Sequence, residues 1–211
     1  MEKGYKNAAW FFLLLIPLIG AAFFRTYFMH VPDFPEHISL YSHLHFIAAA
    51  LWIVLMLSQP LLIRARNMKG HRRLGTLSYI LFPLFILSFF PLVWKAAKGP
   101  EPAFIFFPLA DAFLLILFYT LAILNRKKMN LHMRYMIALA LVFLGPTVGR
   151  IGPIFFGLST VQTQTIQYAI VLLILLGLLS RDRKNKRDYR PYGVALAGFG
   201  VHIIIFYSLF L

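Results

Sequence analysis

Long apolar runs, separated by short charged segments, constrain this chain more than any other feature of its sequence. A helix needs about 20 mainly apolar residues to cross the hydrocarbon core of a bilayer. In chain order, the runs that approach this length are Ala8–Phe24, Ser42–Ile63, Thr76–Lys95, Ala103–Leu124, Tyr135–Leu158, Ile166–Leu179 and Val194–Leu211. Backbone groups inside lipid must bond within their own segment, which favours helices. We therefore predict an all-α integral membrane protein, a single domain of residues 1–211 with about seven transmembrane helices.

The first and sixth runs each need a further argument. Lys3 and Lys6 before the first run imitate a secretory signal, but the segment 23–25 offers no small-residue cleavage site. We therefore expect the first helix to be retained. The sixth run reaches a full span only if its helix begins near Gln162.

Composition agrees with this class and excludes several kinds of site. Charged residues make up 13% of the chain, whereas soluble domains carry about a quarter. The chain has no cysteine, which excludes disulfides, iron–sulfur clusters and thiolate metal sites. The net charge of +14 lies in short loops between apolar runs. This pattern indicates contact with anionic lipid headgroups, and we predict no nucleic-acid partner.

The distribution of Lys and Arg between the loops predicts an orientation. Cations concentrate in the second, fourth and sixth loops: Arg64, Arg66, Lys69, Arg72 and Arg73; Arg126, Lys127, Lys128 and Arg134; Arg181, Arg183, Lys184, Lys186, Arg187 and Arg190. Basic loops face the cytoplasm. We therefore expect a multi-pass protein of the bacterial cytoplasmic (inner) membrane, with its N-terminus inside and its C-terminus outside. A six-helix version, with one run re-entrant, would put the C-terminus inside.

Two opposite charges lie at matching depth in the predicted bundle. Asp111 and Arg150 are each about eight residues from the outer end of their helices, or about 12 Å below the outer boundary. Their depth and charge make an ion pair plausible, either as part of a site or as a lock between two helices. Gly145-Pro146 and Gly152-Pro153 bracket Arg150, which predicts a broken helix that lines a cavity, or else an ordinary proline kink.

Histidines form the rest of an outer layer. His43 and His45 lie near the outer end of the second helix, and His202 lies within the seventh. If His202 faces one of the other two, the imidazoles could hold haem b or a divalent metal ion. The alternative is that His202 only hydrogen-bonds a neighbouring helix. Trp52 and Gln59 follow His45 at intervals of seven residues, which places all three on one helix face.

An inner layer contains His71 and His132, each at the point where a basic loop enters a helix. Arg72 and Arg134 follow them closely. Such groups suit haem propionates, a phosphate or carboxylate substrate, or lipid headgroups. The alternative is simple anchoring at the membrane interface.

The segments Ser42–Tyr79 and Asn130–Ile151 resemble a bacterial family of multi-helix membrane proteins that carries only a domain-of-unknown-function label. Its pattern is a helix with His, Trp and Gln, then an HRxxG loop, and later an HxxxM segment before a helix with an Arg. The matching positions are His45, Trp52, Gln59, His71, Arg72, Gly75, His132, Met136 and Arg150. The layout is also distantly similar to transmembrane b-type cytochromes, which implies haem held between facing helices. Those proteins place the ligands inside the helices, whereas His71 and His132 lie at helix ends.

Four classes of function follow from these residues, and they leave open whether the protein is an enzyme. The first is haem or metal binding in a redox or respiratory cofactor-assembly role. The alternative is a small-molecule transporter or receptor with an Asp111/Arg150 cavity and no cofactor. Seven helices with an inner N-terminus also resemble the membrane zinc hydrolase superfamily, which implies an intramembrane metal hydrolase. This hypothesis ranks lower, because Phe206 stands four residues after His202, where that superfamily has a second histidine. The fourth is a structural subunit of a larger membrane complex.

Overall fold

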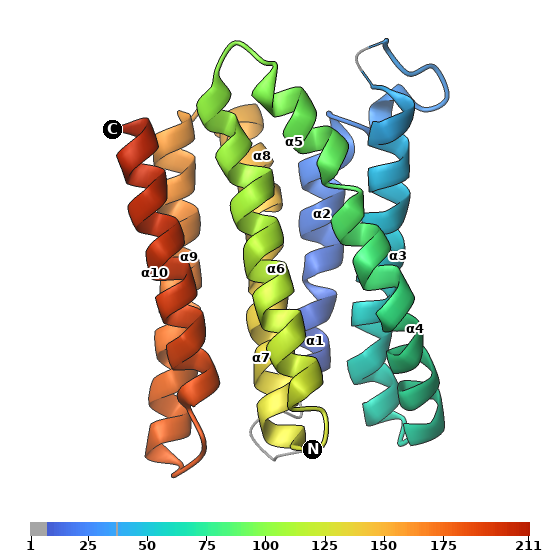
Figure 1. The fold of residues 1–211 in the computed structure, drawn as a ribbon, viewed down its shortest axis with the longest axis vertical. Coiled ribbons are helices and arrows are strands. Elements are labelled where there is room, and N and C mark those ends of the chain that lie inside the picture. Colours follow the sequence, from blue (N-terminus) through green and yellow to red (C-terminus); the bar gives the residue numbers. More distant parts are fainter. Residues whose placement is uncertain (1–7, 37) are drawn as a thin grey trace. The chain divides into compact units, whose positions relative to one another are not determined.

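The computed structural model describes residues 8–36 and 38–211 as helices joined by short loops, and this part of the chain contains no strand (Figure 1). Helices long and apolar enough to cross a membrane span Leu40–Arg64, Met68–Ala97, Ala103–Leu124, Met129–Phe156, Thr160–Lys184 and Arg190–Phe210. A shorter apolar helix covers Trp10–Phe24. The prediction of an all-helical chain is confirmed for the described residues, and each predicted run overlaps one of these seven helices. Lys3 and Lys6 lie outside the described residues.

Three of these helices are interrupted, and proline accounts for each interruption. The paired segments are α1 (Ala8–Leu13) and α2 (Leu15–Phe24), α4 (Met68–Leu87) and α5 (Phe90–Ala97), and α7 (Met129–Val142) and α8 (Leu144–Phe156). Pro17, Pro91 and Pro146 each stand four residues after the last residue of the first segment. Proline offers no N–H to that carbonyl, and its ring clashes there. Of the two alternatives for the fifth run, the structure shows the proline kink: the backbone of Phe143 keeps helical angles, and Arg150 lies within the continuous helix α8.

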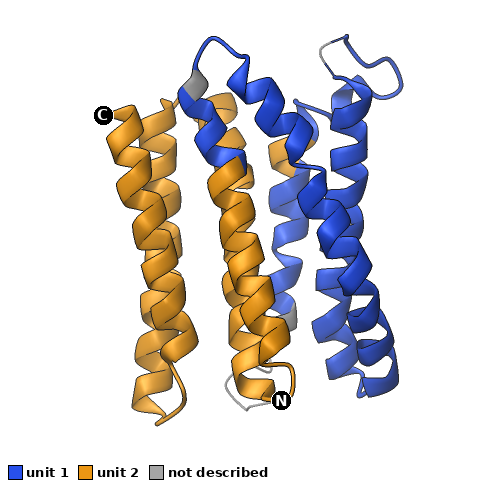
Figure 2. Cartoon of the chain, in the orientation of Figure 1, with its two compact units in different colours: residues 1–20, 24–108 blue, residues 21–23, 109–211 orange. Residues whose placement is uncertain are grey.

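The chain divides into two compact units (Figure 2). Unit 1 comprises Met1–Gly20 and Phe24–Pro108. Its main feature is a hairpin of α3 (Leu40–Arg64) and α4, against which α1 and α5 pack through α3. Unit 1 also contains most of α2 and two short 3-10 helices, η2 (Phe28–His30) and η3 (Pro102–Ile105). Trp52 is fully buried on α3, where its ring stacks on Phe85 and lies tilted against Phe82 of α4, so aromatic packing joins the hairpin.

Unit 2 comprises Ala21–Phe23 and Leu109–Leu211. It contains most of α6 (Phe106–Leu124), together with α7, α8, α9 (Thr160–Lys184) and α10 (Arg190–Phe210). Its core is α7, in which every residue from Ile137 to Val142 is buried. The start of α9 at Thr160 agrees with the expectation of a start near Gln162. A capping box explains it, because Ser159 and Gln162 bond to each other's backbone N–H.

Helices α8 and α9 approach each other closely at Gly152. A Cβ atom at this position would lie 2.5 Å from Oγ1 and 2.7 Å from Cγ2 of Thr163, whereas a Cβ at Gly149 would meet nothing within 4 Å. We therefore expect Gly152→Ala to lower the free energy of unfolding by about 1–3 kcal/mol. Gly149→Ala should change it by less, and in the stabilising direction, because alanine favours helix.

Thermal unfolding of the purified protein in detergent measures both variants. Thr163→Ala combined with Gly152→Ala should recover part of the loss, because it removes the two atoms that clash. Equal melting temperatures for Gly152→Ala and Gly149→Ala would contradict the close approach.

Candidate functional site

Unit 2 brings together three polar side chains from three helices. Nε2 of His202 on α10 lies 3.6 Å from Oδ1 of Asp111 on α6. Nδ1 of the same ring lies 2.8 Å from the hydroxyl of Tyr168 on α9. His202 and Tyr168 are buried, and the Asp111 side chain is 19% exposed. The three residues form a continuous chain, which we call the Asp–His–Tyr chain.

The Asp–His–Tyr chain lies at one level inside the apolar helices. Asp111 is eight residues after Ala103, Tyr168 is eight after Thr160, and His202 is eight before Phe210. At a rise of 1.5 Å per residue, this is about 12 Å from the helix ends. Polar groups at such depth in a membrane are costly and mark functional sites. We therefore take the Asp–His–Tyr chain as the candidate site.

Further polar side chains of α9 extend the Asp–His–Tyr chain. Gln164 donates from Nε2 to Oε1 of Gln167 over 2.7 Å, and both side chains are buried. Gln164 also interacts with the Tyr168 hydroxyl. Sequence reasoning did not single out Tyr168 or these amides. Their spacing of three and four residues, which places them on one helix face, is the signal that could have found them.

Asp111 lies beside the kink in the fifth apolar helix. A Cβ added to Gly145, in the first turn of α8, would meet the Asp111 carboxylate oxygens at 3.5 and 3.6 Å. These are ordinary van der Waals distances, so the carboxylate lies against the first turn of α8. The charge of Arg150, further along α8, also acts on Asp111. In this arrangement His202, rather than Arg150, makes the close contact with Asp111.

Among the described residues, Arg150 makes one hydrogen bond and one cation–π contact. Its NH1 group donates to the carbonyl of Pro146 over 2.8 Å. The carbon of its guanidinium lies 4.4 Å from the centroid of the Phe23 ring, in a cation–π contact. The side chain is half-buried. Arg150 therefore stands in the apolar span with most of its hydrogen-bonding capacity unused by these contacts.

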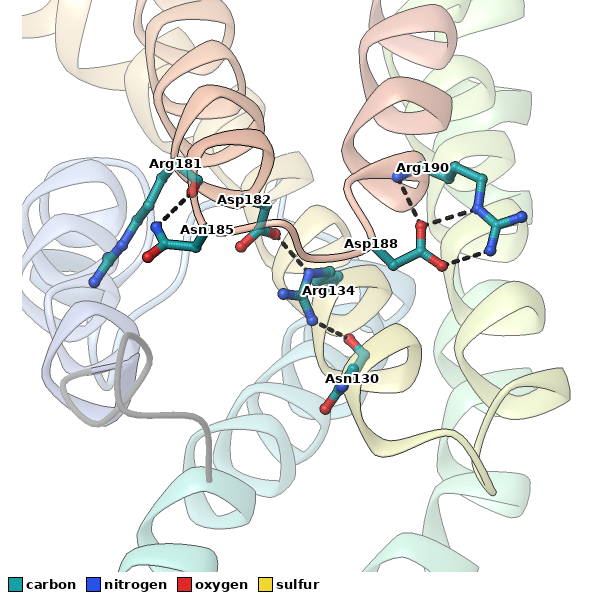
Figure 3. Close-up of polar contacts among 7 residues, drawn as sticks. All are labelled: Asn130, Arg134, Arg181, Asp182, Asn185, Asp188 and Arg190. Atoms are coloured by element: carbon teal, nitrogen blue, oxygen red, sulfur yellow. Dashed lines mark hydrogen bonds and ion pairs between the residues drawn. The ribbon is translucent and has the colours of Figure 1, made fainter.

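Arg134 makes a buried ion pair at the end of unit 2 where α7 begins (Figure 3). Its Nε donates to Oδ2 of Asp182 on α9 over 2.6 Å, and both side chains are 0% exposed. NH1 donates to the carbonyl of Asn130 over 2.8 Å. Arg134, a predicted cofactor contact, thus joins α7 to α9. Asp182 was not a candidate, because it stands in a run of basic residues.

A second ion pair at this end is exposed. Arg190 bonds Asp188 through two guanidinium nitrogens, at 2.9 and 2.6 Å, and this contact lowers the pKa of the Asp188 carboxyl. The pair borders an open cavity of about 300 Å³ that is also lined by Lys128, Met129, Asn130 and Leu131. Its cations agree with the expected contact with anionic headgroups, which remains a prediction.

The structure places the other candidate histidines on α7 of unit 2 and on α3 and α4 of unit 1. In unit 2, His132 in the first turn of α7 directs Nδ1 at the carbonyl of Ala122, 2.9 Å away. In unit 1, His43 bonds the Tyr27 hydroxyl at 2.7 Å, and His45 bonds Ser88 at 2.9 Å. His71 is half-buried in the first turn of α4. The next residue, Arg72, is exposed.

Trp52 and Gln59 share a face of α3 with His45, as expected from their spacing. Both polar atoms of the Gln59 amide are buried, and they meet no hydrogen-bond partner among the described residues. This position could accept a polar group that completes its bonding.

No group of three His, Asp or Glu side chains within residues 8–36 and 38–211 is arranged to hold a metal ion. Of the proposed metal ligands, His43 and His45 belong to unit 1 and His202 to unit 2. Haem or metal binding by these residues, or by His71 and His132, therefore stays a prediction. A scan against protein-family models and searches among curated proteins and solved structures found no match to this chain.

Proposed function

We propose that this chain is a multi-pass protein of the bacterial cytoplasmic membrane, with seven spans, an inner N-terminus and an outer C-terminus. The six long apolar helices and the basic even-numbered loops support this topology. The long helices also present large apolar side chains at their surfaces. Val54, Ile80, Phe113, Leu173 and Ile204 are between 61% and 71% exposed. Lipid is the solvent in which such surfaces are stable.

For its activity, we propose proton-linked transport of a small solute. The observation that carries this proposal is the Asp–His–Tyr chain at one depth within unit 2. Chains of carboxylates and histidines inside membranes serve as proton relays in pumps and transporters. Histidine is the side chain whose charge changes most readily near neutral pH.

The two ring nitrogens of His202 give the Asp–His–Tyr chain a direction for proton movement. A neutral ring protonated on Nε2 accepts a hydrogen bond from the Tyr168 hydroxyl at Nδ1 and turns its N–H toward Asp111. The gap of 3.6 Å to Asp111 is within ion-pair range and longer than a direct hydrogen bond. Protonation of His202 increases its attraction to the carboxylate and shortens this gap, which links the charge of the site to its geometry.

The kinked helix beside the site supports transport. Phe143 keeps helical backbone angles, so the segment Met129–Phe156 bends near Pro146 without unwinding. Gly145, against which the Asp111 carboxylate lies, follows this kink. A carboxylate in this position can respond to movement between α7 and α8.

Reconstitution tests the proposal. Purified protein is placed in liposomes that trap a pH-sensitive dye, and small anionic, cationic and neutral solutes are added outside. We expect at least one solute to change the internal pH several-fold faster than in protein-free liposomes. If no member of a broad panel moves protons, proton-linked transport is wrong.

Haem or metal binding in a redox or cofactor-assembly role is a second candidate, favoured by His132. A carbonyl only accepts hydrogen bonds, so the contact with Ala122 places the proton on Nδ1 and, in the neutral ring, the lone pair on Nε2. Metal-ligating histidines are commonly oriented in this way. An absorption spectrum of the oxidised and reduced protein distinguishes the candidates. A Soret band that disappears in His132→Ala supports haem, and a colourless preparation contradicts it.

A further inference from the structure

Arg150 is a cation inside an apolar span with unused hydrogen-bond donors. It lies six residues before the end of α8 at Phe156. A guanidinium has five N–H donors, and here a single contact, from NH1 to the Pro146 carbonyl, is made with the described residues. The Phe23 ring covers one face of the group. The other donors are therefore available to a ligand.

The contrast with Arg134 in the same unit is informative. Arg134 is fully enclosed, and its charge is matched by the carboxylate of Asp182 at 2.6 Å. Arg150 has no carboxylate within ion-pair distance among the described residues, and the acid whose charge acts on it, Asp111, contacts His202. Because a charge away from water is normally paired, the surroundings of Arg150 favour a bound anion.

We infer that Arg150 binds the carboxylate of a small monoanionic solute, which is carried together with a proton held by Asp111 or His202. This inference rests on the proposed proton-linked transport. The planar guanidinium presents parallel donors that match the two oxygens of a carboxylate. The substrate class is thus a small monocarboxylate.

The charges of the site support one anion and one proton. With His202 neutral, the charges of Asp111 and Arg150 cancel. A bound monoanion adds one negative charge, and one proton on the Asp–His–Tyr chain restores neutrality. A neutral loaded site avoids the cost of moving net charge through the apolar layer. A dianion such as sulfate would leave one charge uncompensated.

Pyruvate is a suitable probe in the liposome assay. We expect pyruvate added outside to acidify the interior, and choline, glucose and sulfate to have no such effect. Arg150→Gln should slow the pyruvate response by about 10- to 100-fold, the range expected for losing hydrogen bonds to a charged group. Arg150→Lys keeps the charge but loses the paired donors, so it should raise KM more than it lowers the maximal rate. Arg73→Gln, at an exposed arginine of unit 1, should behave as wild type.

A binding measurement separates this inference from the proposed transport. Pyruvate should raise the melting temperature of the wild-type protein in detergent, and should not do so in Arg150→Gln. If Arg150→Gln does not fold, the KM of Arg150→Lys decides. Wild-type pyruvate transport by a folded Arg150→Gln variant overturns the inference. If choline or glucose drives proton movement and pyruvate does not, the inferred monocarboxylate site is wrong, while the proposed proton-linked transport is supported. If no solute moves protons but the melting shift depends on Arg150, transport fails and the anion site is supported.

Discussion

Asp111→Asn is expected to abolish proton-linked transport without unfolding the protein. Asparagine has nearly the same shape as aspartate and can still bond His202, but it cannot accept a proton. Proton transfer by a positioned side chain typically contributes about 100-fold or more to a rate. We therefore expect the solute-driven pH change in proteoliposomes to fall by about that factor. The melting temperature in detergent should change little, because Asp111 keeps a partial exposure of 19%.

Two further variants distinguish a proton relay from a structural contact. Tyr168→Phe keeps the ring that packs on His202 and Phe206 but removes the hydroxyl, so it should slow proton movement with the packing retained. Asp188→Asn removes a carboxylate from the exposed pair with Arg190 and should leave transport unchanged. Transport at the wild-type rate by Asp111→Asn would exclude the carboxylate from the relay.

Breaking the buried ion pair between Arg134 and Asp182 is expected to cause the largest loss of stability. Removing one partner leaves the other charge enclosed without compensation, which typically costs about 3–5 kcal/mol. We expect Arg134→Ala and Asp182→Ala each to lower the free energy of unfolding by about this amount. The double variant Arg134→Met with Asp182→Leu should recover much of it, because apolar residues can replace a buried pair.

The chain offers a matched control for this experiment. Arg190 and Asp188 also approach to 2.6 Å, but the Arg190 side chain is 79% exposed. Exposed pairs contribute about 0–1 kcal/mol, so Asp188→Ala should have a small effect. Denaturant titration of the four single and double variants in detergent makes the comparison. Similar losses for the buried and exposed pairs would show that enclosure of Arg134 is not what stabilises α7 against α9.

The apolar runs predicted the helices well, because length and hydropathy alone decide whether a segment suits a bilayer. The run Ala103–Leu124 agrees with the structure at both ends. Limits were missed where polar residues continue a helix. Basic residues, for example, extend α9 beyond the predicted end at Leu179 to Lys184. The effect of Pro146 was predicted, and Pro17 and Pro91 have the equivalent effect on two other helices.

The candidate site was predicted only in part, for a physical reason. Depth along each helix identified Asp111, Arg150 and His202, since it follows from residue number. Rotation about the helix axis decides which of them meet, and helices that are apolar on all sides carry little periodic signal to set it. The sequence could therefore not decide whether Asp111 contacts His202 or Arg150. Tyr168 was missed because tyrosine in a membrane helix is ordinarily an interfacial or packing residue.

The enclosed pair on α7 has a consequence for biosynthesis. Asp182 follows Arg134 by 48 residues, so the ribosome completes α7 well before the partner of its arginine exists. Until α9 emerges, Arg134 stays at the cytoplasmic surface in the proposed topology, where water and headgroups solvate it. Helix α7 can therefore reach its final packing only after α9 has been synthesised. A chain truncated before Asp182 should leave α7 open to proteolysis from the cytoplasmic side.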